Sequence, residues 1–175
     1  MRALLAALGL ALPAADPSPP AATPPAAVDP LEVSRARIAA ELVAIGGELQ
    51  RAIEAGDAGP ILARVPAGGL RCAGEVVPKA RVSRDLRAPA SWLHGVVFGP
   101  PGPPPPGPPA SLRAFLAAAK DLAVVVSFQP DRLAGPEGRP CLDFRTKGVT
   151  TPGVPFCFSR DGGRWWLTES LYPCG

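Results

Sequence analysis

The chain has 175 residues, and its 18 lysine and arginine side chains against 15 aspartate and glutamate side chains give a formal charge of +3. This small charge argues against a dedicated nucleic-acid surface, which needs a much denser positive footprint. The length is sufficient for one domain that buries a core without metals or oligomerisation.

The first 27 residues are predicted to form a secretory signal peptide and a Pro/Ala-rich leader. Arg2 precedes an apolar run of about a dozen residues, which has the dimensions of an export signal and is too short for a membrane span. Residues 16–30 are too rich in Pro, Ala and Ser to pack. We therefore expect an exported protein, periplasmic or secreted, with one α+β domain over residues 28–175 and no transmembrane segment. The alternative is an Ala/Leu-rich disordered N-terminus.

A long amphipathic helix is predicted from Pro30 onward. Apolar side chains recur at spacings of three, four and seven, and charged side chains fill the other faces. Asp29 and Pro30 suit the N-cap and the first turn, and Gly56 suits the end of the helix. The apolar positions are Leu31, Ile38, Leu42, Ile45, Leu49 and Ile53.

The helix contains a glycine pair, Gly46-Gly47, near its middle. Each glycine costs about 1 kcal/mol relative to alanine, so the pair indicates either close packing of another backbone or a helix that simply tolerates it. Beyond the helix, Asp57 is expected to cap a second short helix over Gly59 to Val65.

Residues 70–98 hold five basic and two acidic side chains. Because few aromatic residues accompany them, this pattern is typical of a solvated face rather than of a phosphate or nucleic-acid site. The same stretch contains the only histidine, His94, whose ordinary pKa suits proton transfer near neutrality. As a catalytic base it would need an orienting carboxylate, for which Asp85 and Asp143 are the candidates. The alternative is a half-buried structural histidine beside Trp92.

A proline-rich loop is expected over residues 99–110. Its sequence, GPPGPPPPGPP followed by Ala, breaks the Gly-X-Y period and excludes a collagen helix. We interpret it as a rigid surface spacer; the alternative, a ligand for a proline-recognition groove, belongs chiefly to intracellular signalling.

A helix and a strand are expected after this loop. Ser111 can cap the helix, and Leu112, Phe115 and Leu116 lie on one of its faces. The run 122–128 is β-branched and apolar on both sides, which predicts a central strand.

The end of the chain predicts three short strands, the last two joined as a β-hairpin. A turn at Asp161-Gly162 would place Phe158 opposite Trp165. It would also place Phe156 opposite Leu167, so that one face of the ribbon is apolar. The alternation is carried by Val154, Phe156, Phe158, Trp165, Leu167 and Leu171.

Two segments resemble the nuclear transport factor 2-like (SnoaL-like, cystatin-like cone) superfamily. ELQRAIEAGDAGPILARV, residues 48–65, resembles its opening, a long amphipathic helix that ends in Ala-x-x-x-Gly-Asp before a short helix. RDGGRWWLTES, residues 160–170, is similar to its closing hairpin, with an Asp-Gly-Gly turn before a Trp-bearing strand. The resemblance implies a curved antiparallel sheet around the long helix, with a pocket on the concave face. It implies no single activity, because this fold hosts isomerases, dehydratases, cyclases and plain binding modules.

Four cysteines, Cys72, Cys141, Cys157 and Cys174, suggest two disulfides in an oxidising compartment. Free or partly paired thiols are the alternative. No metal site is expected, because the chain has no Cys-x-x-Cys and its histidine is not near any cysteine pair.

Strand geometry ranks the possible cysteine pairings. An antiparallel pairing that sets Leu142 opposite Phe156 also sets Cys141 opposite Cys157, so a cross-strand bridge is predicted between these two cysteines. Cys174 lies too far along the extended chain from this pair. It is therefore predicted to bond to Cys72.

The expected architecture is α+β, with the long N-terminal helix packed on a curved antiparallel sheet of four or five strands and a proline-rich loop insert. We expect a non-catalytic module whose sheet concavity binds a small apolar ligand or an envelope protein, without a cofactor. The alternative is an isomerase, dehydratase or cyclase in which His94 is the base and a carboxylate orients it inside a closed pocket. The candidate binding residues are Trp92, Phe128, Phe144, Trp165 and Trp166.

Overall fold

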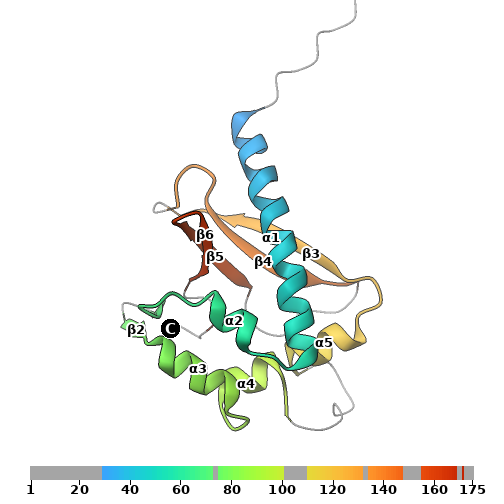
Figure 1. The fold of residues 1–175 in the computed structure, drawn as a ribbon. Helices are drawn as coiled ribbons and strands as arrows, with labels where there is room; N and C mark the ends of the chain where they lie inside the picture. The colour runs from blue at the N-terminus through green and yellow to red at the C-terminus, as the bar shows by residue number, and fades with distance from the viewer. Residues whose placement is uncertain are drawn as a thin grey trace, which may run out of the picture.

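The computed structural model describes residues 29–72, 75–100, 110–131, 134–147, 155–168 and 171. The predicted signal peptide and leader, most of the proline-rich loop, Val154 and Cys174 lie outside these ranges. The fold is α+β: the long helix α1 packs against an antiparallel four-stranded sheet (Figure 1). Of the helices in the described part of the chain, none combines the length and the apolarity that a bilayer span requires.

In chain order, two helices precede a short β-hairpin, three helices follow it, and four strands then form the larger sheet. In order they are α1 (Pro30–Ala55), α2 (Gly59–Ala63), β1 (Leu70–Cys72), β2 (Glu75–Val77), α3 (Lys79–Arg87), α4 (Trp92–Val97), α5 (Leu112–Ala118), β3 (Ala123–Gln129), β4 (Arg139–Arg145), β5 (Phe156–Asp161) and β6 (Arg164–Leu167).

Helix α1 begins and ends where its sequence predicts. The Asp29 carboxylate accepts a hydrogen bond from the Leu31 amide, which satisfies one of the free N–H groups of the first turn. Gly56 ends the helix at φ 73°, a left-handed conformation that glycine adopts without penalty. Leu42 and Leu49 are buried, so the predicted apolar face is the one that covers the sheet.

Gly46 lies at a close contact between α1 and the sheet. A methyl group built on it would lie 2.6 Å from Val124 Cγ1 and 2.8 Å from Leu142 Cδ1. The close packing expected at the glycine pair is therefore present, but its partners are side chains of β3 and β4 rather than another backbone. Gly47 faces away, and the same methyl group there would meet only Arg51 Nη1, at 3.5 Å.

The sheet has the strand order β3-β4-β5-β6. Cys141 pairs with Cys157, and the two are joined by a disulfide, as predicted. The prediction that the strand 122–128 is central is wrong: β3 is the first strand in the order, and in the described residues it pairs only with β4. No residue of β3 is fully buried, so its β-branched apolar run reflects strand propensity, whereas a central position depends on backbone pairing at both edges.

The closing hairpin is present, but its predicted register is wrong by two residues. Asp161 pairs with Arg164, so Gly162 and Gly163 form the turn, with φ 56° and 75°. Two central residues at positive φ are what a two-residue hairpin turn requires, and a Gly-Gly pair satisfies this better than Asp-Gly. Phe158 consequently pairs with Leu167. Because a shift of two preserves the side-chain alternation, the apolar face is retained and buried.

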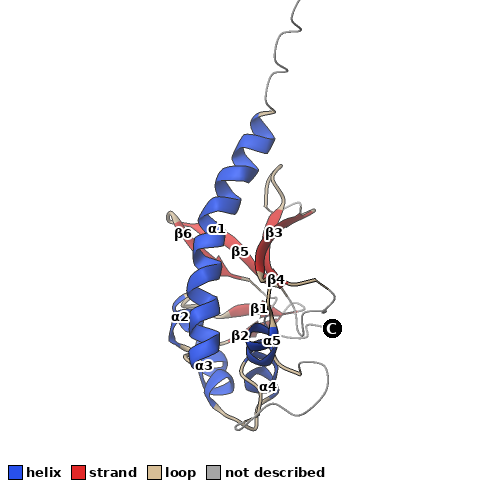
Figure 2. Ribbon diagram, turned by 90° about the vertical axis from the view of Figure 1, so that its right-hand side faces the viewer, coloured by secondary structure: helices blue, strands red, loops and turns tan. Residues whose placement is uncertain are grey.

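The segment before the sheet folds into small elements around the C-terminal half of α1. Figure 2 shows α2, α3, α4, α5 and the β1-β2 hairpin gathered at this end, with the four-stranded sheet beside the middle of the helix. The second short helix forms as α2, and the Asp57 carboxylate accepts a hydrogen bond from the Gly59 amide at 2.8 Å. Ser111 caps α5 as predicted, its hydroxyl accepting from the Ala114 amide.

Candidate functional site

His94 lies on α4 with its ring held against α3. Its Nδ1 is 2.8 Å from the carbonyl oxygen of Leu86; because a carbonyl only accepts, Nδ1 is the donor. The ring also packs on Phe98, with centroids 5.3 Å apart. In the described residues the ring thus has a backbone partner, and its geometry is that of a histidine that ties two short helices together.

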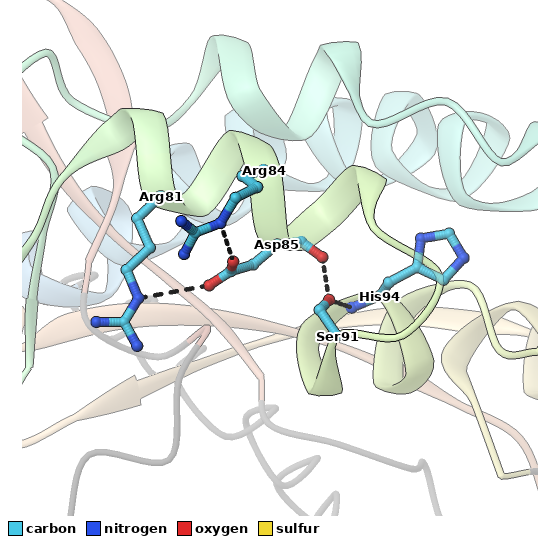
Figure 3. Close-up of polar contacts among 5 residues, drawn as sticks. All are labelled: Arg81, Arg84, Asp85, Ser91 and His94. Carbon is cyan, nitrogen blue, oxygen red and sulfur yellow. Dashed lines mark hydrogen bonds and ion pairs between the residues drawn. The ribbon is translucent and has the colours of Figure 1, made fainter.

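The two candidate carboxylates lie elsewhere. In Figure 3 the His94 ring points away from the Asp85 carboxylate, which is ion-paired with Arg84 at 3.1 Å and with Arg81 at 3.6 Å. Asp143 is on β4 and forms an ion pair with Arg145 at 3.2 Å. The structure therefore does not gather the three predicted catalytic residues into one set.

The five candidate binding residues are also dispersed. Phe144 and Trp165 are buried in the core, whereas Trp92 is 51% exposed on α4. Phe128 and Trp166 are half-buried. An arginine stacks over each of these last two rings, at 5.3 Å and 4.4 Å from the ring centroid. The prediction was that some of these five residues line a sheet concavity. In the described residues α1 packs against β3 and β4 of the sheet.

A cleft of about 650 Å³ lies where the first half of α1 crosses the end of the sheet. Its walls come from α1, the turn before β1, β1 itself, the β3–β4 connection and the strands β4 to β6. Trp165 lines it, and so do Ile38 and Pro66. Of the five predicted binding residues, only Trp165 belongs to this lining. The cleft is the candidate functional site.

The lining carries an excess of positive charge. Four arginines line the cleft, one each from α1, β1, β4 and β5, against two carboxylates among the described residues. The arginines are Arg37, Arg71, Arg139 and Arg160, and the carboxylates are Asp131 and Glu137.

One wall of the cleft is fixed by a network that joins α1 to the closing hairpin. The indole Nε1 of Trp165 donates to Glu41 Oε2 at 2.8 Å, and Arg160 Nη2 lies 3.4 Å from the same oxygen. The Arg160 guanidinium also sits over the Trp165 ring, 5.3 Å from its centroid. Trp165 is thus a buried aromatic with its polar group satisfied, which holds its ring in one position.

A second part of the lining is fixed by Glu137, in the connection before β4. The Ser34 hydroxyl donates to its carboxylate at 2.9 Å, and Arg35 Nε donates to its backbone carbonyl at 3.1 Å. A backbone hydrogen bond, the Ser34 hydroxyl and the charges of Arg35 and Arg37 together lower the pKa of Glu137 below its ordinary value. The Glu137 carboxylate therefore helps to hold the β3–β4 connection against α1.

Comparison with protein-family models, curated proteins and solved structures found no match. The site is therefore characterised by its own chemistry. In the part of the chain that the structure describes, no three His, Cys, Asp or Glu side chains are grouped in a way that could hold a metal ion.

Sequence reasoning missed the charged lining because its residues are scattered. Arg37 and Arg160 are separated by most of the chain, and no local motif links them. Arg139 and Arg160 lie near the ends of their strands, so nothing in the local sequence marks them as lining a cleft.

Proposed function

We propose that this protein is a non-catalytic, extracytoplasmic binding module and that the cleft between α1 and the closing strands is its ligand site. The observation that supports this most is the cleft itself, because 650 Å³ falls in the range of pockets that hold small molecules. Its walls are built on a long helix and a disulfide-linked sheet, which are rigid supports for a binding site.

The ligand is proposed to have an apolar body. Ile38, Pro66 and Trp165 offer it an apolar surface beside the charged side chains of the lining. A binding role is favoured over a catalytic one because the carboxylates of the lining are engaged. Glu137 is held by Ser34, and Asp131 accepts from Arg139 Nε at 2.7 Å. His94 lies on α4 and is not among the lining residues.

Two observations support an exported protein. Residues 1–27 have the composition of a signal peptide and leader, and Cys141 and Cys157 are disulfide-bonded, which is typical of oxidising compartments. Cys72 is also in a disulfide, and Cys174, its predicted partner, lies outside the described residues. Mass spectrometry of the expressed protein with and without reductant tests this proposal. Reduced thiols together with an intact Met1 would contradict it.

Membership of the nuclear transport factor 2-like superfamily is likewise a proposal. It is supported by the order of a long helix, a short second helix and a closing hairpin with a Gly-Gly turn. The antiparallel sheet against which α1 packs is in keeping with it.

Binding at the cleft can be tested by nuclear magnetic resonance of the mature, oxidised protein. We expect at least one of three isosteric probes, benzoate, benzamide or benzylamine, to cause saturable shifts of amide signals from cleft residues at concentrations up to roughly 20 mM, which covers millimolar affinity. Ile38→Ala should weaken this binding because it removes part of the apolar lining. Val43→Ala is the matched control, because Val43 is on the same helix but is exposed and outside the cleft. The proposal fails if no probe shifts the cleft signals, or if both variants behave alike.

A further inference from the structure

We infer that the ligand of this cleft is a small organic anion, and that Arg37 and Arg71 bind its carboxylate or phosphate group. This inference rests on the proposed function above and adds the chemical class of the ligand. It follows from a comparison of the cleft arginines that form ion pairs with those that do not.

Two of the four cleft arginines are neutralised by neighbouring carboxylates. Arg139 forms an ion pair with Asp131, and Arg160 forms one with Glu41. These pairs shape the walls and contribute little net attraction for an anion. Arg160 is further fixed by its stacking on Trp165.

Arg37 and Arg71 are different. Both are exposed, both line the cleft, and within the described residues neither makes an ion pair or a side-chain hydrogen bond. The charge of Arg37 acts on Glu137, whose carboxylate is held by the Ser34 hydroxyl. Two guanidinium groups thus remain available to a ligand, and each can bind a carboxylate or a phosphate through two parallel N–H···O bonds.

The backbone that carries Arg71 is held in a defined position. Gly69, two residues before it, has φ 94°, and a methyl group there would collide with the carbonyl oxygen of Val77 across the β1-β2 pair. The neighbours of Arg71 are Leu70, which is buried, and Cys72, which is in a disulfide. Arg37 lies on the second turn of α1, whose backbone is fixed by helical hydrogen bonds. The two cations are therefore presented from rigid elements, which reduces the entropy lost on binding.

The charge of the lining selects an anion over a cation. Both carboxylates of the described lining already have hydrogen-bond donors, so a cationic ligand would have to compete for them. An anion at Arg37 and Arg71 need not break either of the ion pairs at Arg139 and Arg160, and a concave surface with excess positive charge focuses the field on it. With the apolar surface of Ile38 and Trp165 beside the arginines, the favoured ligand has an apolar body and one anionic group.

The test compares ligands that share a phenyl ring and differ in the charge of the attached group. Benzoate, phenyl phosphate, benzamide and benzylamine are titrated into the mature, oxidised protein at low salt, and dissociation constants are obtained from the cleft amide shifts. We expect an anion to bind about fivefold more tightly than benzamide, as one or two exposed ion pairs would give, and benzylamine to bind least. The ratio of the benzoate and phenyl phosphate constants decides which anionic group is preferred.

Two variants locate the charges. Arg37→Gln and Arg71→Gln should each weaken the preferred anion about threefold and leave benzamide unchanged, because each removes one exposed ion pair. Arg113→Gln is the matched control, since Arg113 is an exposed arginine of α5 outside the cleft. Added sodium chloride should weaken the anion and not benzamide. Circular dichroism and unchanged urea midpoints confirm that the variants are folded.

The possible failures are distinguishable. If benzamide or benzylamine binds at the cleft as tightly as the anions, or if neither arginine variant weakens the anions, the inference is wrong while the proposed binding function stands. If none of the four probes shifts cleft signals, both are overturned.

Discussion

The adjacent glycines of α1 provide a stringent test of how the helix meets the sheet. In Gly47→Ala the new methyl group meets only Arg51 Nη1 at 3.5 Å, an ordinary contact. Since alanine is about 0.8–1.0 kcal/mol better than glycine in a helix interior, we expect this variant to be stabilised by nearly that amount.

Gly46→Ala gains the same helix propensity but loses more by crowding. Its methyl group would lie 2.6 Å from Val124 Cγ1 and 2.8 Å from Leu142 Cδ1, so both side chains and the helix must shift. Overpacking of this kind typically costs about 1–3 kcal/mol. The two variants should therefore differ by about 1–3 kcal/mol, or roughly 5 °C in Tm for a chain of this size.

Urea unfolding of both variants, followed by tryptophan fluorescence without reductant, measures this difference as a shift of midpoint at unchanged slope. Gly47→Ala serves as the control for helix propensity in the same turn. If Gly46→Ala proves as stable as Gly47→Ala, the tight contact between α1 and the β3–β4 surface is not present.

Further predictions concern the bridge, the indole network and acid stability. Replacing Cys141 and Cys157 by alanine should lower the free energy of unfolding by about 3 kcal/mol, since their separation of 16 residues closes a loop of that order; an unchanged urea midpoint would contradict this. Glu41→Ala should cost about 1–2 kcal/mol because it leaves the Trp165 indole N–H without its acceptor, whereas Glu41→Gln keeps an oxygen there and should cost less in the same urea assay. Because the pKa of Glu137 is lowered in the folded state, its ionised carboxylate contributes stability that is lost as the pH falls below the ordinary value of 4.5. Glu137→Gln should therefore lose less stability than the parent between about pH 7 and about pH 3 in urea titrations, and parallel losses would count against the prediction.

Sequence patterns correctly predicted those features that depend on residues close together in the chain. The caps at Asp29 and Gly56, the buried face of α1 and the pairing of Cys141 with Cys157 all follow from spacing and alternation. The hairpin register was wrong because Asp161-Gly162 and Gly162-Gly163 are both acceptable turns, and only the strand pairing decides between them. The edge position of β3 was missed because a β-branched side-chain pattern predicts a strand but not how many of its edges are paired.

The site was predictable only at Trp165. That residue is found by its alternation in a strand, but the cleft that it lines depends on how Arg37 of α1, Arg71 of β1 and the closing strands meet in space. These positions come from distant parts of the chain, and no periodicity connects them. Aromatic residues were expected to line a concavity, whereas Phe144 is buried and arginines and carboxylates make up a third of the described lining.

The contact between Glu41 and Trp165 spans 124 residues of sequence. Helix α1 is made first, whereas the strands β3 and β4 against which it packs and the hairpin that carries Trp165 all come much later in the chain. The apolar side chains of α1 that face the sheet lack their native partners until then, and such exposed apolar surface makes partly folded chains prone to aggregation. We therefore expect the folding rate to be limited by the formation of contacts that are distant in sequence and not by the formation of the helix itself.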